Sequence, residues 1–418
     1  MSDAGWPQLV RVFGRIGLLS FGGPAAQIAL MHRELVETRN WLSEQSFLRA
    51  LSLCMLLPGP EAMQLATYAG WRLRGTAGGL LAGALFVLPG AFLIAVLALL
   101  YARFGQLPAV QAAFLGIKAT VAIIVLQALM KVAGKALTGQ VGWGLAVASF
   151  LALFVFGLPF PLIILLAALI GAAALSVQPA EPGHGVRRQS STLRTVTLWL
   201  LLWFAPLLLV WWLQADFLLQ LGLFFSKLAV VTFGGAYAVL AYMTQTVVQD
   251  FGWITTEQMI DALGLAETTP GPLILVTEFV ALLAGFAQSG LQGALAAGVL
   301  ALWVTFVPCF LWIFVAGPYL DWISGQSRLA AALQGITAAV VGVIANLSLW
   351  FALHVLFRQV DSPQLLALPA PDWASFNPLS AAGMLAAGFL MLRLKWGMVW
   401  TMAAMAALAL GLHLFQAL

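Results

Sequence analysis

Three cations lie inside long apolar stretches, where a charge is costly unless it has a partner or a function. Arg15 and Lys227 each precede a glycine pair by seven residues, and Lys118 lies within the apolar run from Leu107 to Met130. Seven residues of helix span about 10 Å. The spacing predicts that Arg15 and Lys227 reach an anion held at the glycines. The alternatives are that the long stems of Arg15 and Lys227 extend to the membrane surface and that Lys118 forms an internal ion pair with one of the buried acids Glu61, Glu267 and Glu278.

Four hydroxyl groups stand close to the same glycines and to two proline-rich motifs. Ser20 and Thr232 occupy matched positions before the glycine pairs, and Thr268 and Thr269 precede Pro270. A hydroxyl can donate a hydrogen bond to an oxyanion. These side chains therefore fit the same anionic ligand as the cations.

Three acids, Glu61, Glu267 and Glu278, also lie in apolar segments. Burial favours the protonated form of a carboxyl group, so each acid is a candidate to carry a proton in exchange for an anion. Glu61 has a second interpretation, because the helix dipole stabilises a carboxylate in the first turn of a helix. The sequence does not choose among the three acids.

Glycine and proline motifs interrupt four apolar segments: Gly22-Gly23-Pro24, Pro58-Gly59-Pro60, Gly234-Gly235 and Pro270-Gly271-Pro272. Helices break at such motifs. A break inside a membrane survives only where it is buried in protein or lines a wet cavity, and the helix that starts after it attracts anions. The alternative is close helix packing with ordinary kinks. Four breaks in repeat-related positions favour a shared central anion site.

The predicted site combines these groups and contains no catalytic or metal-binding residue. The candidates for substrate binding are Arg15, Ser20, Gly22, Gly23, Pro58, Gly59, Lys118, Lys227, Thr232, Gly234, Gly235, Thr268, Thr269 and Gly271.

The sequence repeats itself in register. An offset of 212 residues places Phe13–Gly23 on Phe225–Gly235 and Pro58–Pro60 on Pro270–Pro272, and after a seven-residue insertion an offset of 219 pairs Pro89 with Pro308 and Gln127 with Asn346. Such agreement indicates duplicated halves, residues 9–176 and 217–415. The predicted domains are an N-terminal repeat (1–176), a polar loop with one linking apolar span (177–216) and a C-terminal repeat (217–418).

Six apolar segments in each half, with one span between them, predict halves of inverted topology. Basic residues predict the orientation, because they gather on the cytoplasmic side. The N-terminus is then cytoplasmic and the C-terminus periplasmic. The broken segments either cross the membrane, giving thirteen spans, or turn back, giving nine spans and four re-entrant elements, and the charges of the 32–49 loop favour the second version. The residues on the predicted cytoplasmic side are Arg11, Arg15, Lys131, Lys135, Arg187, Arg188, Arg194, Arg328, Arg393 and Lys395, with Arg103 and Arg358 opposite.

Composition places the chain among all-α integral membrane proteins. Hydrophobic residues make up 62% of it and charged residues 8%, against about 25% charged residues in soluble domains. The N-terminal stretch contains two arginines and lacks a cleavage site, so it is not expected to be a removed signal peptide. Cys54 and Cys309 lack metal-binding neighbours, and no phosphate-binding loop is found. These observations argue against an enzyme, a bound cofactor, direct use of ATP and nucleic-acid binding.

The motifs resemble those of the chromate ion transporter family. The resemblance rests on Phe21-Gly-Gly-Pro24, Trp41, Pro58-Gly-Pro60, Phe233-Gly-Gly-Ala-Tyr-Ala-Val-Leu240, Gly252-Trp253 and, as the most specific marker, Ala266-Glu-Thr-Thr-Pro-Gly-Pro-Leu-Ile274. It covers both halves and implies the long form in which two units are fused.

The resemblance implies a secondary transporter of a bacterial inner membrane that exports chromate, driven by the proton gradient, and so confers chromate resistance. Its expected partners are the lipid bilayer, protons and chromate or the isosteric sulfate, and a homodimer is left open. Alternatives are a transporter of sulfate or another anion, an anion channel, and a transporter of cations or neutral solutes. The residues alone support an anion-selective transporter; the identity of the anion comes from the resemblance.

Overall fold

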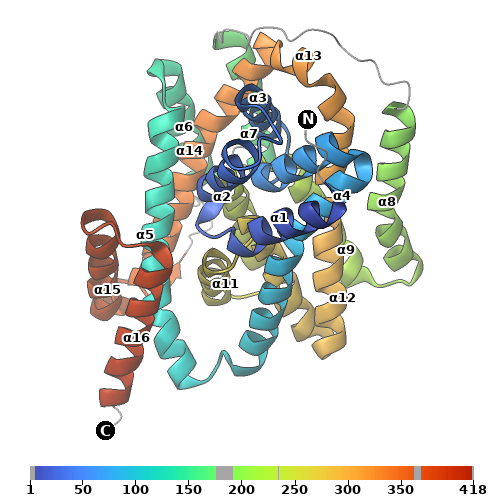
Figure 1. The fold of residues 1–418 in the computed structure, drawn as a ribbon. Coiled ribbons are helices and arrows are strands. Elements are labelled where there is room, and N and C mark those ends of the chain that lie inside the picture. The colour runs from blue at the N-terminus through green and yellow to red at the C-terminus, as the bar shows by residue number, and fades with distance from the viewer. Residues whose placement is uncertain (1–4, 176–191, 234, 362–368, 417–418) are drawn as a thin grey trace. The chain divides into compact units, whose positions relative to one another are not determined.

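The computed structural model describes residues 5–175, 192–233, 235–361 and 369–416, and these residues fold almost entirely as helices (Figure 1). Six of the helical segments are long and apolar enough to cross a membrane: Glu61–Phe104, Pro108–Ala136, Thr192–Trp212, Leu273–Tyr319, Ser327–Leu356 and Met398–Phe415. The protein is therefore an all-α integral membrane protein, as the composition predicts.

The chain forms two compact units, and each unit takes segments from both predicted halves. Unit 1 comprises residues 1–99, 176–236 and 269–331, and unit 2 comprises residues 100–175, 237–268 and 332–418. Neither unit coincides with a predicted repeat, so a unit is completed only by segments far apart in the sequence.

Several helices of unit 1 lie among the described residues; α4 continues past its boundary, and the first residues of α14 (Ser327–Leu356) also belong to it. The helices are α1 (Trp6–Leu19), α2 (Gly23–His32), α3 (Glu44–Leu56), α4 (Glu61–Phe104), α8 (Thr192–Trp212), α9 (Asp216–Val231), α12 (Val276–Ala316) and α13 (Leu320–Ser324). The predicted linking span is α8, and it packs along α12 through stacked Trp199 and Phe310 and a hydrogen bond of 2.8 Å from Trp303 Nε1 to the Leu202 carbonyl oxygen. The polar loop before it lies mostly outside the described residues.

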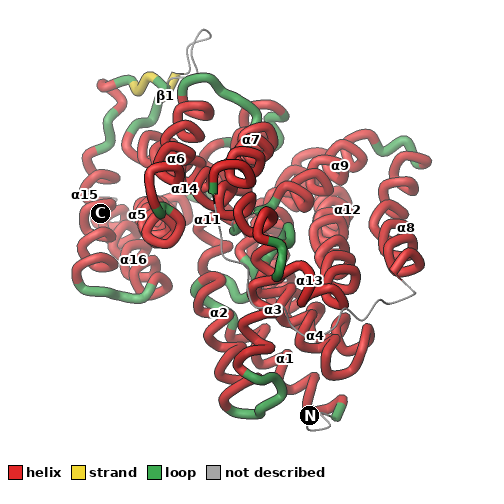
Figure 2. The backbone as a smooth tube through the Cα atoms, turned by 90° about the horizontal axis from the view of Figure 1, so that it is seen from above, coloured by secondary structure: helices red, strands yellow, loops and turns green. Residues whose placement is uncertain are grey.

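Unit 2 contains the other helices and one pair of short strands. The helices are α5 (Pro108–Ala136), α6 (Gly139–Phe154), α7 (Phe160–Ala174), α10 (Ala236–Thr244), α11 (Thr256–Thr268), α14 (Ser327–Leu356), α15 (Pro378–Gly388) and α16 (Met398–Gln416). Strands β1 (Val360–Asp361) and β2 (Ala370–Pro371) pair antiparallel. Helices α11, α15 and α16 pack against α5, and Figure 2 shows α15 and α16 beside it.

Helices end at the predicted breaks. Helix α1 ends at Leu19 before the first glycine pair, α3 ends at Leu56, α9 ends at Val231, and α11 ends at Thr268. After the last break a single 3₁₀ turn (Leu273–Leu275) precedes α12. Glycine and proline thus terminate these helices where the sequence predicts it.

Two further turns were not predicted. Within α4 the backbone leaves helical geometry at Arg74 and Gly75, and within α12 it does so at Ser289 and Gly290. A Cβ atom on Gly70 would lie 2.3 Å from the Gly78 carbonyl oxygen, although eight residues of straight helix span about 12 Å. The chain therefore folds back on itself at Gly75, and the same contact between Gly285 and Gly293 shows a second tight hairpin.

Contacts with one end of α12 favour a re-entrant path for the segment that is broken at Pro58–Pro60. Leu53 on α3 packs with Ala316 and Leu320, while Trp71, beyond the break, contacts Gly317. Both arms of the break thus lie at the same end of α12. These contacts are consistent with the re-entrant version that the loop charges favour, and re-entry stays a prediction.

Secondary structure recurs at the offset of the sequence repeat. Helices α3 and α11 begin at residues 44 and 256 and end at 56 and 268, which is an offset of 212 at both ends. Short π-helical turns begin at Arg33 and at Gln245, again 212 residues apart. Because π-helical turns are rare, their recurrence supports the duplication that the sequence predicts.

Candidate functional site

Backbone hydrogen bonds join the helix breaks in unit 1 into two pairs. The Gly271 N–H donates to the Ser20 carbonyl oxygen at 3.0 Å, and the Gly59 N–H donates to the Thr232 carbonyl oxygen at 2.9 Å. Ser20 corresponds to Thr232 in the repeat, and Gly59 corresponds to Gly271. The same bond is therefore made twice, with the two halves exchanging the roles of donor and acceptor.

The glycines of these breaks adopt backbone conformations that other residues avoid. The φ angles are +86° and +78° at Gly22 and Gly23, +116° at Gly59, +100° at Gly235 and +97° at Gly271. A side chain at such angles clashes with the backbone. These glycines are required by the shape of the breaks; Gly234 lies outside the described residues.

A small cavity lies among the joined breaks. Its volume is about 10 Å³, roughly the room that one water molecule requires. In this conformation it is too small for a tetrahedral oxyanion. The residues that line it are Pro24, Gln27, Pro60, Glu61, Ala62, Thr232, Ala236, Pro272, Leu273 and Ile274.

Two buried glutamines hold the breaks, and the sequence reasoning did not single them out. The Gln27 amide donates from Nε2 to the carbonyl oxygens of Ser20 at 3.1 Å and Gly271 at 2.7 Å. The Gln64 amide donates to the Pro58 carbonyl oxygen at 2.6 Å, and its own oxygen accepts no hydrogen bond within the part of the chain that the structure describes. A polar amide within an apolar run is the signal that could have identified both.

The predicted hydroxyl donors bond their own helices. Ser20 donates to the Ile16 carbonyl oxygen at 2.5 Å, Thr232 to the Leu228 carbonyl oxygen at 2.6 Å, and Thr268 to the Leu265 carbonyl oxygen at 2.8 Å. Hydroxyls near a helix end commonly bond the carbonyl one turn back. Their oxygen atoms keep acceptor capacity, but their protons are directed away from the cavity. Thr269 is buried beside Pro270.

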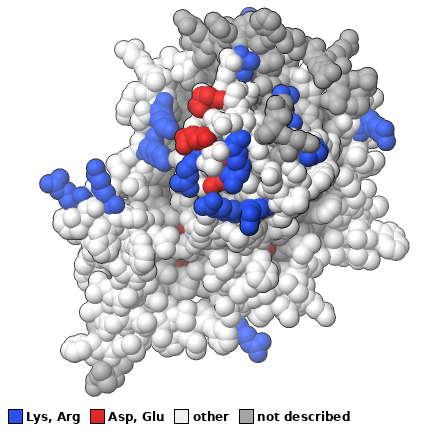
Figure 3. Space-filling view, in the orientation of Figure 1, with Lys and Arg blue, Asp and Glu red and all other residues white. Residues whose placement is uncertain are grey.

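The structure does not bring Arg15 and Lys227 to the cavity between the breaks. Both lie on exposed faces of their helices, because α1 and α9 bury their other, apolar faces. Arg15 lies 3.4 Å from the carboxylate of buried Glu34, which also receives a hydrogen bond from Arg39. Figure 3 shows basic side chains gathered with acids over this part of unit 1 on an otherwise largely uncharged face.

The three predicted acids lie in separate places. Glu61 stands in the first turn of α4 and lines the small cavity. Glu278 belongs to unit 1, and its Oε2 is buried without a hydrogen-bond partner among the described residues. Glu267 belongs to unit 2, where the Tyr237 hydroxyl donates to its Oε1 at 2.5 Å. Of the three, Glu61 is the acid that lines the small cavity.

Lys118 belongs to unit 2 and forms an internal ion pair, but its partner is not one of the three acids expected from the sequence. Its Nζ lies 3.6 Å from Oδ1 of Asp261, an acid on α11 that the sequence reasoning did not single out. The Tyr101 hydroxyl donates to the other carboxylate oxygen at 2.7 Å. This pair is a second polar centre, built entirely within unit 2.

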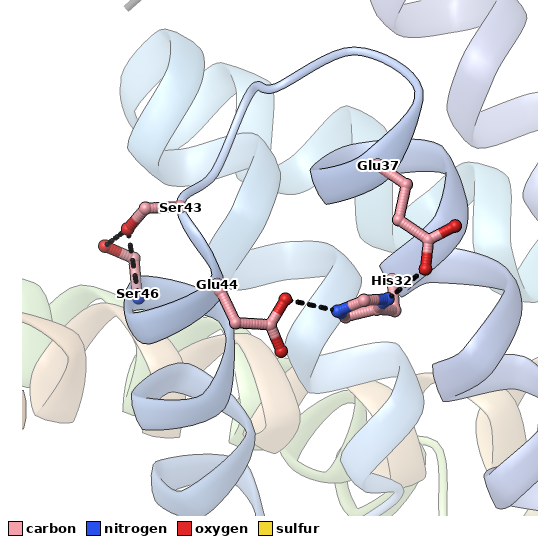
Figure 4. A network of polar contacts seen from close by, with 5 residues as sticks. All are labelled: His32, Glu37, Ser43, Glu44 and Ser46. Carbon is pink, nitrogen blue, oxygen red and sulfur yellow. Dashed lines mark hydrogen bonds and ion pairs between the residues drawn. The ribbon is translucent and has the colours of Figure 1, made fainter.

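An exposed histidine cluster fixes the corner between α2 and α3 (Figure 4). His32 contacts Glu44 through Nε2 at 2.6 Å and Glu37 through Nδ1 at 3.1 Å. The hydrogen bond to Glu44 and the charges of both carboxylates raise the pKa of His32 above its ordinary value of 6.5, although partial desolvation opposes the rise. The corner lies outside the six candidate spans.

The His32 cluster should stabilise this corner more at pH 6 than at pH 8. A raised folded-state pKa means that the stabilisation is complete below the unfolded value and is lost as the pH rises through the folded value. Hydrogen exchange of residues 33–46, corrected for intrinsic rates, should therefore be slower at pH 6. His32→Gln should remove the difference, and an unchanged difference in that variant would contradict the assignment.

Comparison with known proteins relates the chain to transporters. The family model described as chromate transporter matches residues 7–172 and 219–412. A chromate transport protein of Pseudomonas aeruginosa is 33% identical, over 91% of this chain and 86% of the relative. A chromate transport protein of Cupriavidus metallidurans is 32% identical, over 86% of each chain. A probable chromate transport protein of Synechococcus elongatus is 32% identical, over 84% of each chain. No solved structure matches.

Proposed function

Because the chain belongs to the chromate transporter family, we propose that it exports chromate from the cytoplasm by secondary transport, in exchange for protons. Chromate is a tetrahedral dianion, and three relatives carry chromate transport in their names. Export by this route would confer chromate resistance. Sulfate has the same shape and charge, so it is the expected competitor.

The observation that carries the proposal is the pair of exchanged hydrogen bonds between the helix breaks. Half-helices that begin at a buried break offer N–H groups and a positive dipole end to an anion. Helix α2 begins at Gly23 without a side-chain cap, so apart from Pro24, which has no N–H, the amides of its first turn lack a side-chain partner. Positive-φ glycines keep side chains out of the space in front of them. The breaks thus form a place where an oxyanion can bind through backbone groups.

The small cavity suits a transporter in its closed, unloaded state. The space of about 10 Å³ must widen before an oxyanion binds, which requires the two pairs of breaks to separate. A structure with two repeat-related pairs can open one pair at a time, on opposite sides of the membrane. Alternating access in inverted-repeat transporters has this form.

Packing within unit 1 supports the inverted arrangement. Gly79 and Gly83 of α4 contact Phe314 and Phe310 of α12 respectively. Residue numbers rise along α4 while they fall along α12, so these repeat-related helices run antiparallel. With the cytoplasmic basic residues, this arrangement supports a cytoplasmic N-terminus and a periplasmic C-terminus.

Arg15 and Lys227 remain proposed as anion contacts only in a conformation that differs from this one. In this structure they lie on exposed faces, and Arg15 serves as a partner of Glu34. The backbone of the breaks, rather than these side chains, is the better supported anion site.

Inverted membrane vesicles test the proposal, because their interior corresponds to the periplasm. Vesicles that contain the protein should accumulate radiolabelled chromate above control vesicles, and an acidic interior should increase the accumulation. A protonophore should abolish that increase, and sulfate should compete. Uptake equal to that of control vesicles would overturn the proposal, whereas uptake without accumulation against a gradient would indicate an anion channel.

A further inference from the structure

Unit 2 contains a large polar cavity that none of the three predicted acids lines. Its volume is about 1080 Å³, which is room for many water molecules. It lies between the end of α4, α5, α11 and the segment after α14. The charged and titratable side chains that line it are Tyr101, Lys118, Glu257, Asp261, His354, Arg358 and Asp361.

Asp261 is the buried acid of this cavity. Its side chain is 5% exposed and lies 3.6 Å from Lys118, whose side chain is 19% exposed. The Tyr101 hydroxyl donates to Oδ2, whereas Oδ1 accepts no hydrogen bond within the described residues. One carboxylate oxygen is therefore fixed, and the other faces only an ammonium group that has access to the cavity.

A group that carries a proton across a membrane needs burial and a path to water. A buried acid without a path to water cannot release its proton. An exposed acid can exchange its proton, but its protonation has little effect on the packing of the protein. Glu267 lies on the same helix as Asp261 and also accepts a bond from a tyrosine, but it does not line the cavity. Glu61 lines a space of only about 10 Å³. Asp261 combines burial with access.

We propose that Asp261 is the binding site of the coupled proton and that Lys118 is the counter-ion that it holds or releases. This inference rests on the proposed function and names the residue that performs its proton step. A proton from cavity water binds Oδ1 while Tyr101 continues to donate to Oδ2. The neutral acid then no longer attracts Lys118, and the ion pair between α11 and α5 is lost.

Other charges near Asp261 modulate this step. Glu257 stands one turn earlier on α11, and Arg358, Asp361 and His354 face the cavity from the segment around the end of α14. Helix α16 packs against α11 through the apolar Met402 at Gly264. Among the described residues, Lys118 is the cation that lies within ion-pair distance of Asp261.

Protonation of Asp261 can reach the anion site through chain connectivity. Helix α11 ends at Thr268, and the next residues form the break whose Gly271 bonds Ser20. Loss of the ion pair removes one tie between α11 and α5, which also pack through Gly264 against Ile117 and Val121. A shift of α11 along its axis would then move this break directly. The proton and the anion would then both change the position of the break after α11, and such a shared element is what coupling between two sites requires.

The test separates driven transport from exchange in vesicles that contain the full chain. Wild type should accumulate chromate under an acidic interior and should also exchange external labelled chromate for internal chromate at equal pH. Asp261→Asn should reduce the pH-driven accumulation of chromate at least about tenfold and should exchange chromate at equal pH as the wild type does. Asp250→Asn, the same change at an exposed acid of unit 2 that does not line the cavity, should keep both activities.

A second variant guards against loss of the fold. The double substitution Lys118→Gln and Asp261→Asn removes both charges together, so it leaves no unpaired buried charge, and it should behave as Asp261→Asn does. Retained pH-driven accumulation in Asp261→Asn, or loss of exchange in both variants at normal protein levels, would overturn the inference alone. Absence of both activities in the wild type would overturn the proposed function, and this inference with it.

Discussion

Replacement of Gly59 or of its repeat mate Gly271 by alanine is expected to reduce chromate uptake at least about tenfold, since 1.4 kcal/mol is a factor of ten. The φ angles of +116° and +97° cost a non-glycine residue about 1–2 kcal/mol. A Cβ atom on Gly59 would also lie 2.9 Å from Cys309 Sγ, and one on Gly271 would lie 3.0 Å from Leu275 Cδ1. The backbone must therefore shift, which disturbs the bond to Ser20 or Thr232.

Gly14→Ala is the matched control for these two variants. Gly14 lies within α1 of the same unit, and a Cβ atom there would meet nothing within 4 Å. Alanine is a better helix former than glycine by about 1 kcal/mol, so this variant should transport normally and unfold at an equal or higher temperature. Chromate uptake in vesicles and thermal unfolding in detergent measure the two effects. Wild-type uptake by Gly59→Ala and Gly271→Ala would show that the breaks do not need their observed shape.

Gln27→Leu is expected to destabilise unit 1 and to impair transport, although the new side chain is apolar and similar in size. Gln27 is 2% exposed, and its amide donates to the carbonyl oxygens of Ser20 and Gly271. A buried polar group that loses its partner costs about 1–3 kcal/mol. Gln27→Glu should be more harmful, because an ionised carboxylate cannot donate and would repel both oxygens.

The control for Gln27 is Gln8→Leu, the same change at an exposed position of α1 in the same unit. That variant should unfold at the wild-type temperature and should transport chromate at the wild-type rate. Thermal unfolding and vesicle uptake at matched protein levels again measure the outcome. If Gln27→Leu and Gln8→Leu behave alike in both assays, Gln27 does not hold the breaks together.

Local chemistry made much of the fold predictable from the sequence. Adjacent glycine and proline residues favour helix ends, so the ends of α1, α3, α9 and α11 follow from the motifs, whereas the single prolines Pro89, Pro206 and Pro308 lie inside helices. Apolar runs longer than a bilayer is thick predict membrane spans without reference to the partners that pack on them. The resemblance of both halves to the chromate transporter motifs agrees with the family match over residues 7–172 and 219–412.

The hairpin turns at Gly75 and Gly290 were beyond the sequence for a physical reason. A glycine in an apolar segment permits both a tight turn and a close helix contact. The residues around the glycine are of the same kinds in the two cases, so the sequence does not distinguish them. Only the approach of Gly70 to Gly78, and of Gly285 to Gly293, distinguishes the turn from the contact. That approach depends on how the two arms pack.

The functional groups divide in the same way between sequence and tertiary structure. The sequence by itself determined which residues break the helices and which charges lie in apolar segments, because those properties belong to single residues and their neighbours. Tertiary structure decided which way each charge points. Arg15 turns to Glu34 because its helix buries the opposite face, and Lys118 meets Asp261. Residues 118 and 261 are brought together by the packing of α5 on α11, which no local pattern encodes.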